Sequence, residues 1–176
     1  MIEIKEKEEC CGCTACYSAC PKKAITMQAD EEGFQYPDVD ENKCVNCGLC
    51  EKVCPILKTK SVGKGISQKL AIQNRNENER YSSTAGGFFS LVADWVIEEK
   101  QGAVFAVGFD GIRIVHKCAR SISELDEMRG SKYTQSELKD TFREVKTHLE
   151  AGDYCLFVGT PCQVHGMAEF IGGGQY

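Results

Sequence analysis

The sequence predicts an α+β protein in two parts, a small cysteine-rich domain followed by a larger α/β domain. Nine of the twelve cysteines lie before residue 55. A polar stretch with glycine and serine, KTKSVGKGISQK, follows at residues 58–69 and has the composition of a linker. Beyond it, apolar runs of strand length alternate with helical patterns. We therefore place the two domains at residues 1–60 and 61–176.

Composition narrows the class of protein. The formal charge of −5 is spread along the chain, which disfavours nucleic acid or an anionic membrane as the partner. No apolar run approaches the roughly 20 residues that a membrane span needs. The N-terminus lacks the apolar core of a signal peptide, so we expect a cytoplasmic protein. Twelve cysteines in such a chain favour metal binding over a disulfide scaffold.

Eight cysteines form two runs with one spacing. Residues 10–21 and residues 44–55 both read C-x₂-C-x₂-C-x₃-C-P. This is the bacterial-type pattern for two 4Fe–4S clusters, in which the fourth cysteine of each run ligates the other cluster. The first cluster then takes Cys10, Cys13, Cys16 and Cys54. The second takes Cys44, Cys47, Cys50 and Cys20. The pattern resembles the two-cluster bacterial ferredoxin domain over about residues 5–60.

The spacing has a local physical reason. Two-residue gaps let a tight loop wrap three thiolates around one cluster, and a short helical turn carries the fourth thiolate away. Pro21 and Pro55 then end that turn. Small residues such as Gly12 and Gly48 let backbone N–H groups approach the sulfurs. Four-thiolate zinc is the alternative metal, but zinc sites seldom repeat this spacing before Cys-Pro.

Two further features of this region carry expectations. Cys11 falls outside the frame, and we interpret it as a small side chain packed against the cluster shell, with replacement ligation as the alternative. Between the runs, EEGFQYPDVDENK predicts a short hairpin or loop. We expect this segment to place Phe34 and Tyr36 near the clusters, where aromatic rings shield them from solvent.

The second part predicts an α/β layer with a partly parallel sheet. Strands are expected at residues 70–73, 103–109, 112–116 and 154–159. A helix over residues 86–100 has one apolar face, formed by Phe88, Leu91, Val92, Trp95 and Val96. A second helix over residues 136–152 has Ser136 as its N-cap and Gly152 as its C-cap, and a shorter helix lies within residues 121–129.

Two loop-to-helix junctions have the composition of anion or cofactor sites. SSTAGG, at residues 82–87, places hydroxyls and glycines at a helix N-terminus, although capping and packing explain them equally well. GTPCQVHG, at residues 159–166, predicts a capping box from Thr160 to Gln163 at the end of a strand, where open α/β sheets bind ligands. Cys162 lies in the first turn of that helix, either as a structural residue or as a nucleophile paired with His165.

The remaining polar features are ordinary. RGSKY, at residues 129–133, is a basic loop containing Arg129 and Lys132. We assign the other isolated histidines and cysteines to core or surface positions. They are His116, His148, Cys118 and Cys155.

Read in order, these pieces resemble a known family. The cysteine-rich head, SSTAGGFFSLVADWVIEEKQGAVFAVGFD, RGSKYTQS and LFVGTPCQVHGMAEFIG are similar to the family of coenzyme F-420 hydrogenase/dehydrogenase beta subunits over nearly the whole chain. The resemblance implies an iron–sulfur flavoprotein oxidoreductase of anaerobes. Its FAD exchanges hydride with a small redox coenzyme such as deazaflavin F-420, and its clusters pass single electrons to a redox partner protein or subunit. Family members continue past this point, so the flavin-type domain would be truncated at the C-terminus.

The resemblance also implies a flavin site but assigns no catalytic residue. The positions that would line the flavin come from three short stretches. They are Ser83, Thr84, Gly86, Gly87, Lys132, Tyr133, Gly159, Thr160, Cys162 and Gln163.

Two other functions fit the sequence. One is a non-enzymatic electron-transfer module in which residues 61–176 form a docking domain without a cofactor. The other is a regulatory iron–sulfur sensor, which would need a nucleic-acid-binding element, and the sequence contains no basic recognition helix.

Overall fold

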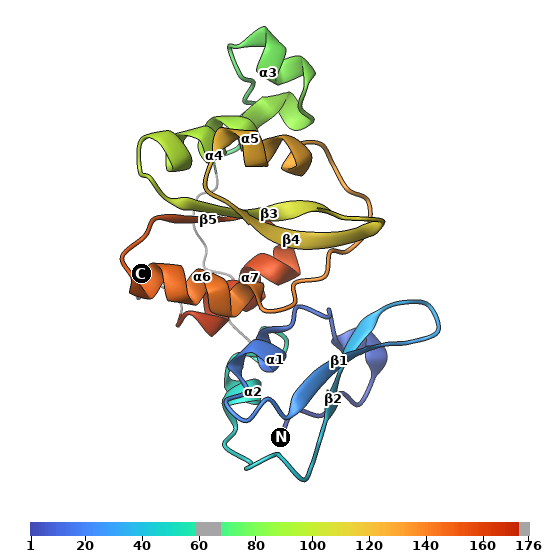
Figure 1. Ribbon diagram of the computed structural model, residues 1–176. Coiled ribbons are helices and arrows are strands. Elements are labelled where there is room, and N and C mark those ends of the chain that lie inside the picture. Colours follow the sequence, from blue (N-terminus) through green and yellow to red (C-terminus); the bar gives the residue numbers. More distant parts are fainter. Residues whose placement is uncertain (59–67, 173–176) are drawn as a thin grey trace. The chain divides into compact units, whose positions relative to one another are not determined.

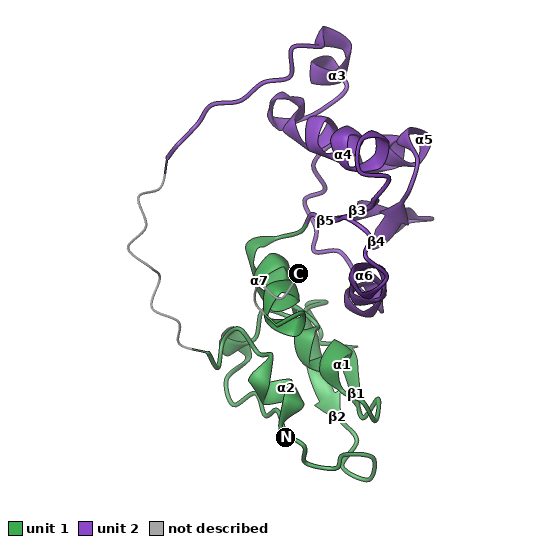
Figure 2. Cartoon of the chain, turned by 90° about the vertical axis from the view of Figure 1, so that its left-hand side faces the viewer, with its two compact units in different colours: residues 1–61, 159–176 green, residues 62–158 purple. Residues whose placement is uncertain are grey.

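The protein was analysed as a computed structural model that describes residues 1–58 and 68–172 (Figure 1). Most of the predicted linker, residues 58–69, lies outside the described residues. The chain forms two compact units (Figure 2). Unit 1 comprises Met1–Ser61 together with Gly159–Tyr176, and unit 2 comprises Val62–Val158. The division into motif-defined domains at residues 1–60 and 61–176 stays a prediction.

Unit 1 has a two-stranded sheet with short helices beside it. In chain order its elements are η1 (Lys7–Glu9), α1 (Ala15–Ala19), β1 (Ile25–Ala29), β2 (Gln35–Val39), α2 (Leu49–Lys52) and α7 (Pro161–Phe170). Strands β1 and β2 pair antiparallel, with Ile25 opposite Val39, so the predicted hairpin or loop of residues 31–43 is the turn and second strand of a hairpin that begins earlier, at Ile25. Asp30 stabilises the turn between the strands, because its Oδ1 accepts hydrogen bonds from the backbone N–H groups of Glu32 and Phe34 at 3.0 Å each.

Unit 2 is a three-stranded sheet covered by helices on both faces (Figure 1). In chain order its elements are α3 (Glu77–Tyr81), η2 (Ala85–Gly87), α4 (Phe88–Glu98), β3 (Ala103–Asp110), β4 (Arg113–Ala119), α5 (Ile122–Leu125), η3 (Asp126–Met128), α6 (Thr141–Glu150) and β5 (Cys155–Phe157). The strand order is β4-β3-β5, with β3 antiparallel to β4 and parallel to β5. The predicted partly parallel sheet is therefore confirmed.

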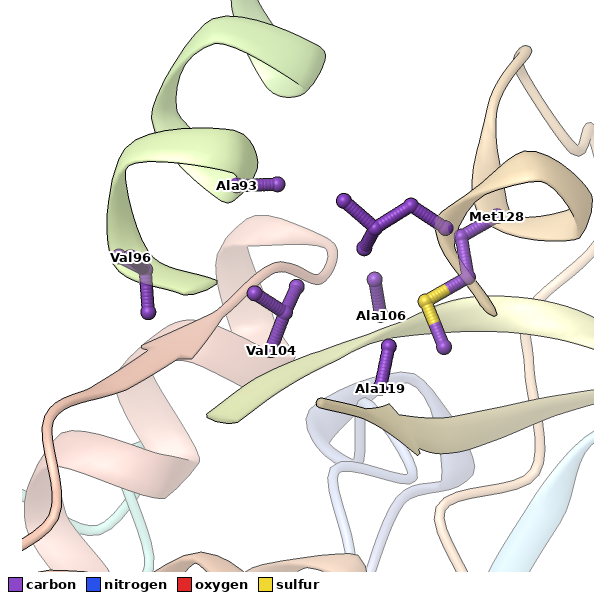
Figure 3. Packing of buried hydrophobic residues seen from close by; sticks show 7 residues of the cluster. Ala93, Val96, Val104, Ala106, Ala119 and Met128 are labelled. Atoms are coloured by element: carbon purple, nitrogen blue, oxygen red, sulfur yellow. The ribbon is translucent and has the colours of Figure 1, made fainter. Parts of the chain in front are cut away.

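The core of unit 2 lies between α4 and the sheet. Ala93 and Val96 of α4 are buried in one cluster with Val104 and Ala106 of β3 and with Met128 (Figure 3). The alanines at the contact let the helix backbone approach the strands closely, and the branched valines fill the remaining space.

The predicted apolar face of α4 is wrong in part. Phe88, Leu91 and Trp95 are each 48% exposed, whereas Ser90 and Ala93 are buried. Large side chains on one stripe satisfy helical periodicity, but small residues on the neighbouring stripe give the closer fit against β3. Unit 2 therefore carries an exposed apolar stripe along α4.

Two other predicted boundaries differ from the structure. Residues 70–73 form no strand. Helix α6 begins at Thr141 rather than near Ser136, because Ser136 Oγ donates a hydrogen bond to His116 Nδ1 at 2.8 Å instead of capping a helix. Of the two positions left open for His116, core or surface, the structure gives the core, and the ring stacks on Phe157.

None of the helices in residues 1–58 and 68–172 combines the length and apolar character that crossing a membrane requires.

Candidate metal centres

Unit 1 contains two pockets of about 370 Å³ each, counting the space open to solvent. The first pocket is lined by Cys10, Cys13, Cys16 and Cys54. The second is lined by Cys44, Cys47, Cys50 and Cys20. The structure thus brings together all eight predicted ligands in the two predicted groups of four, and each group takes its fourth cysteine from the other run.

The short helices α1 and α2 produce this exchange. They pack against each other, and each contains the third cysteine of its run. The fourth cysteine follows at the C-terminal end, with Cys20 as the C-cap of α1 and Cys54 two residues beyond α2. One helical turn therefore separates the third and fourth thiols of a run and directs them into different pockets.

The two cysteine loops have the same backbone conformation. In the first run, Gly12 and Thr14 flank Cys13 with φ of 61° and 63°. At the equivalent positions of the second run, Asn46 and Gly48 have φ of 51° and 73°. These left-handed residues turn the chain sharply around the pocket, which suits glycine and asparagine but strains a β-branched threonine.

Backbone N–H groups donate to sulfurs of two predicted ligands, from residues other than the small ones named in the prediction. Ile2 N donates to Cys50 Sγ at 3.3 Å, and Ala24 N donates to Cys20 Sγ at 3.2 Å. The pockets are otherwise mostly apolar, and burial raises the pKa of the Cys16 thiol to about 12. The bare Cys16 thiolate is therefore disfavoured, and bound metal is the positive charge that would hold this sulfur deprotonated.

The choice between metals rests on the spacing of the cysteines in the sequence. Among residues 1–58 and 68–172, no three His, Cys, Asp or Glu side chains gather tightly enough to hold a single metal ion. A four-thiolate zinc site needs every sulfur about 2.3 Å from one ion. A four-iron cluster is larger, so its thiolates stand further apart around a pocket. The repeated two-residue spacing before Cys-Pro is the observation that favours clusters over zinc ions.

Cys11 lies beside the first pocket, as part of its wall. It follows Cys10 by one position, and the equivalent residue of the second run, Val45, lines the second pocket. An apolar side chain at the equivalent position agrees with the interpretation of Cys11 as a member of the cluster shell.

The prediction that Phe34 and Tyr36 lie near the clusters and shield them from solvent is wrong. Phe34 is 55% exposed, and neither it nor Tyr36 lines either pocket. Alternate residues of a strand face opposite sides, and on β2 the inward positions are Pro37, at the first pocket, and Val39, at the second. Tyr36 takes the other face, where Lys7 Nζ lies 5.3 Å from its ring centroid.

The predicted flavin residues of unit 2 lie on two loops that touch. Thr84 Oγ1 and Ser131 Oγ hydrogen-bond at 3.1 Å, which ties SSTAGG to RGSKY. Ser83 Oγ hydrogen-bonds Ser90 Oγ at 3.1 Å. Lys132 Nζ donates to the carbonyls of Glu127 and Arg129 at 3.0 and 2.8 Å, and Tyr133 is 95% exposed.

The glycines of this loop have a packing role. Gly86 has φ of 72°, and a Cβ atom there would lie 2.6 Å from the Ile72 carbonyl oxygen. Gly87, with φ of 74°, is the N-cap of α4. Both positions therefore need glycine whether or not a ligand binds.

The other predicted flavin residues, Gly159, Thr160, Cys162 and Gln163, belong to unit 1. The capping box is confirmed, since Thr160 N donates to Gln163 Oε1 at 2.9 Å and Gln163 is fully buried. Cys162 Sγ lies 3.1 Å from Thr160 Oγ1, while His165 lies 3.8 Å from Glu169, so these contacts do not orient Cys162 and His165 as a nucleophile pair. Flavin binding at these positions stays a prediction.

The sequence did not predict that α7 packs on the first cysteine loop. A Cβ atom at Gly166 would lie 2.9 Å from Cys13 Sγ, so the helix approaches this thiol through a glycine. Glu169, which is buried, also forms an ion pair with Lys58. A glycine inside an otherwise regular helix was the available signal, because it usually marks close packing.

Comparison with known proteins agrees with these pockets. The 4Fe-4S dicluster domain family matches residues 9–56. An uncharacterized ferredoxin of Methanocaldococcus jannaschii is 40% identical over 74 residues, covering 42% of this chain and 92% of the relative. The PorD component of the pyruvate synthase of Thermotoga maritima is 39% identical over 80 residues, covering 45% of this chain and 63% of the relative.

A longer match is weaker. A component of the F420H2 dehydrogenase of Methanosarcina mazei is 24% identical over 178 residues, covering 94% of this chain and 49% of the relative. This chain therefore spans about half the length of that protein. The fold and pockets of unit 1 define a protein with a two-cluster iron–sulfur domain. Through this N-terminal part, the chain belongs to the ferredoxin-type 4Fe-4S dicluster family.

Proposed function

We propose that this chain carries single electrons through two 4Fe–4S clusters, between a redox partner protein and a flavin that exchanges hydride with a small redox coenzyme. The observation that carries the proposal is the pair of pockets in unit 1, each lined by four cysteines from both runs. Iron–sulfur clusters held this way transfer one electron at a time. The named relatives, a ferredoxin and a component of pyruvate synthase, are consistent with this role.

The two sites differ in how far protein covers them. Helix α7 packs over the first loop at Cys13, which is 8% exposed. Beside the second pocket, Cys47 is exposed, and Val45 and Leu49 are 57% and 39% exposed. Electron transfer between proteins needs a short distance between centres, so the exposed second site is the one we assign to the redox partner. We assign the first site to electron exchange with the flavin, because α7 packs on the first cysteine loop and begins at the predicted flavin turn, Gly159–Gln163.

The flavin part of the proposal rests on two supports. The first is the resemblance across 94% of the chain to a protein named as a component of F420H2 dehydrogenase. The second is the hydrogen bond between Thr84 and Ser131, because it joins the SSTAGG loop to the RGSKY loop that contains Lys132. Partial burial lowers the pKa of Lys132, and a bound phosphate would favour its charged form. FAD would supply two-electron hydride chemistry at this site.

The absorption spectrum of protein purified without oxygen tests the proposal. We expect broad absorption that bleaches on chemical reduction, and bound FAD after its addition. Lys132→Gln should weaken FAD binding, whereas Lys139→Gln, which alters an exposed lysine paired with Asp110, should not. Absorption from clusters with equal FAD affinity in both variants would contradict the flavin site and leave the cluster assignment intact.

A second candidate function is an electron-transfer module whose unit 2 docks a partner without a cofactor. The exposed stripe of Phe88, Leu91 and Trp95 on α4 favours it, because large apolar side chains in a row suit a protein contact. Gly86, Gly87 and Gln163 also have structural roles that need no flavin. A full-length protein that holds two clusters but no flavin would favour this function.

A further inference from the structure

The two pockets of unit 1 differ in the residue that follows the Cys-Pro pair beside each of them. Cys20, Pro21 and Lys22 all line the second pocket. At the first pocket the equivalent residue, after Cys54 and Pro55, is Ile56. An isoleucine thus occupies the same place after the same motif, so packing around the pocket does not require a lysine there.

This difference gives the two pockets walls of opposite charge. Of the described residues that line the second pocket, Lys22 is the only one with a charged side chain. In the corresponding set around the first pocket, that residue is Glu9. Both side chains are exposed to solvent. The second pocket therefore presents a positive charge, although the whole chain has a formal charge of −5.

The acidic residues beside the second pocket do not cancel this charge. Two carboxylates directly follow lining residues in the chain, and each already has a partner. Asp40 forms an ion pair with Lys43 at 2.7 Å, and Glu51 forms one with the Met1 amine at 3.3 Å. Within the part of the chain that the structure describes, no carboxylate pairs with Lys22. Its ammonium group is available to a charge on another molecule.

The same wall also carries exposed apolar side chains. Val45 and Leu49 line the second pocket and are exposed, and the predicted ligand Cys47 between them is exposed as well. Protein interfaces combine an apolar centre with a polar or charged rim, and opposite charges on the two rims speed the encounter. The second pocket has both parts of such a surface around a predicted cluster ligand.

We propose that the redox partner docks over the second pocket through an acidic surface, with carboxylates that pair with Lys22 and an apolar patch that covers Val45 and Leu49. This inference rests on the proposed function, which assigns the second site to the redox partner. One electron crosses between the partner's redox centre and the second site, so one centre is oxidised as the other is reduced. Glu9 repels the same acidic surface from the first pocket.

The test uses the full chain with both clusters, reduced without oxygen, and two one-electron oxidants of opposite charge. Cobalt(III)–EDTA is an anion that carries carboxylates, and cobalt(III) hexaammine is a cation. Each complex takes one electron from the protein and becomes cobalt(II), so the return of visible cluster absorbance measures the rate. At low salt, Lys22→Glu should slow oxidation by the anion by about threefold or more and should speed oxidation by the cation.

Two further variants separate the local charge from the net charge. Lys22→Ile copies the first run and should change both rates in the same directions as Lys22→Glu, but by less. Lys5→Glu is the matched control, because Lys5 is an exposed lysine of unit 1 that lines neither pocket, and its rates should stay close to those of the parent protein. In about 1 M salt all the rates should converge, because charges are then screened within about 3 Å.

Equal changes in Lys22→Glu and Lys5→Glu would overturn the docking proposal, because the net charge of the chain would then set the rate. A parent protein without iron–sulfur absorbance would instead contradict the proposed function. Analytical ultracentrifugation tests for a different occupant of this surface. A dimer of the parent protein that Lys22→Glu dissociates would assign the surface to a second copy of the chain and would also overturn the proposal.

Discussion

Gly166 of α7 faces Cys13 of the first cysteine loop so closely that a Cβ atom at position 166 would lie 2.9 Å from Cys13 Sγ and 3.1 Å from its Cβ. Real Cβ atoms essentially never approach a neighbour as closely as the first of these distances. The helix that begins with the GTPCQ turn therefore packs closely on a predicted cluster ligand, and this contact gives the first prediction.

Gly166→Ala should loosen the first cluster. Alanine raises helix propensity by about 1 kcal/mol, but overpacking against Cys13 costs about 1–3 kcal/mol, so the clash prevails. We expect faster loss of iron absorbance in the presence of a chelator. Val164→Ala, which trims an exposed side chain of the same helix, is the control and should behave like the parent protein. Equal rates of iron loss from the parent protein and from both variants would contradict the close packing of Gly166 on Cys13.

Thr14→Gly should stabilise unit 1. Thr14 has φ of 63°, and its buried Oγ1 has no hydrogen-bond partner among the residues that the structure describes. The equivalent residue of the second run is Gly48, with φ of 73°. Removing a left-handed β-branched residue relieves about 1–2 kcal/mol, which outweighs the roughly 0.5–1 kcal/mol of added chain entropy. The denaturant concentration that removes half the cluster absorbance should rise, and the reverse change, Gly48→Thr, should lower it.

Unit 2 should lose stability in mild acid through His116. The ring is buried, and desolvation lowers its pKa in the folded state below the ordinary value of 6.5. Its Nε2–H donates to the Val158 carbonyl at 2.9 Å, and Nδ1 accepts from Ser136. Below pH about 6.5 His116 binds a proton in the unfolded chain, whereas in the folded chain it binds that proton only at a lower pH. Stability is therefore complete above that pH and falls by up to about 1.4 kcal/mol per pH unit towards the lower folded pKa.

Urea unfolding followed by Trp95 fluorescence measures this effect, since Trp95 is the protein's single tryptophan and lies on α4. His116→Phe should be less stable at neutral pH, because Ser136 and the Val158 carbonyl lose their partner, but its stability should depend less on pH between about 5 and 7. His165→Gln, on α7, should keep the parent pH dependence. If the free energy of unfolding of His116→Phe depends on pH as steeply as that of the parent protein, another group causes the effect.

The sequence predicted the cluster site more fully than the rest of the fold. Spacing alone identified which four cysteines share each pocket, because the three-residue gap and one helical turn direct Cys20 and Cys54 away from their own runs. The partly parallel character of the sheet also followed from the alternation of strands and helices. These features depend on local geometry, which a sequence pattern carries directly.

Tertiary packing decided what the pattern missed. Helical periodicity predicted that Leu91 and Trp95 face the core, because they are large and apolar. In the structure Ala93 is buried in the core instead, because its small side chain lets the helix approach the sheet. Ser136 is a good N-cap by residue type, but a buried histidine 20 positions earlier bonds its hydroxyl. The contact of Gly166 with Cys13 joins segments too distant in sequence for any local pattern to reveal.

The exchange of the fourth cysteine between runs is the central claim, and iron content of two double variants tests it most directly. Cys10→Ser/Cys54→Ser removes two ligands of one pocket, so anaerobic protein should keep the other cluster and about four iron atoms per chain. Cys10→Ser/Cys20→Ser removes one ligand from each pocket and should lose most of both clusters. The opposite pattern, with about four iron atoms in the second variant and almost none in the first, would contradict the exchange.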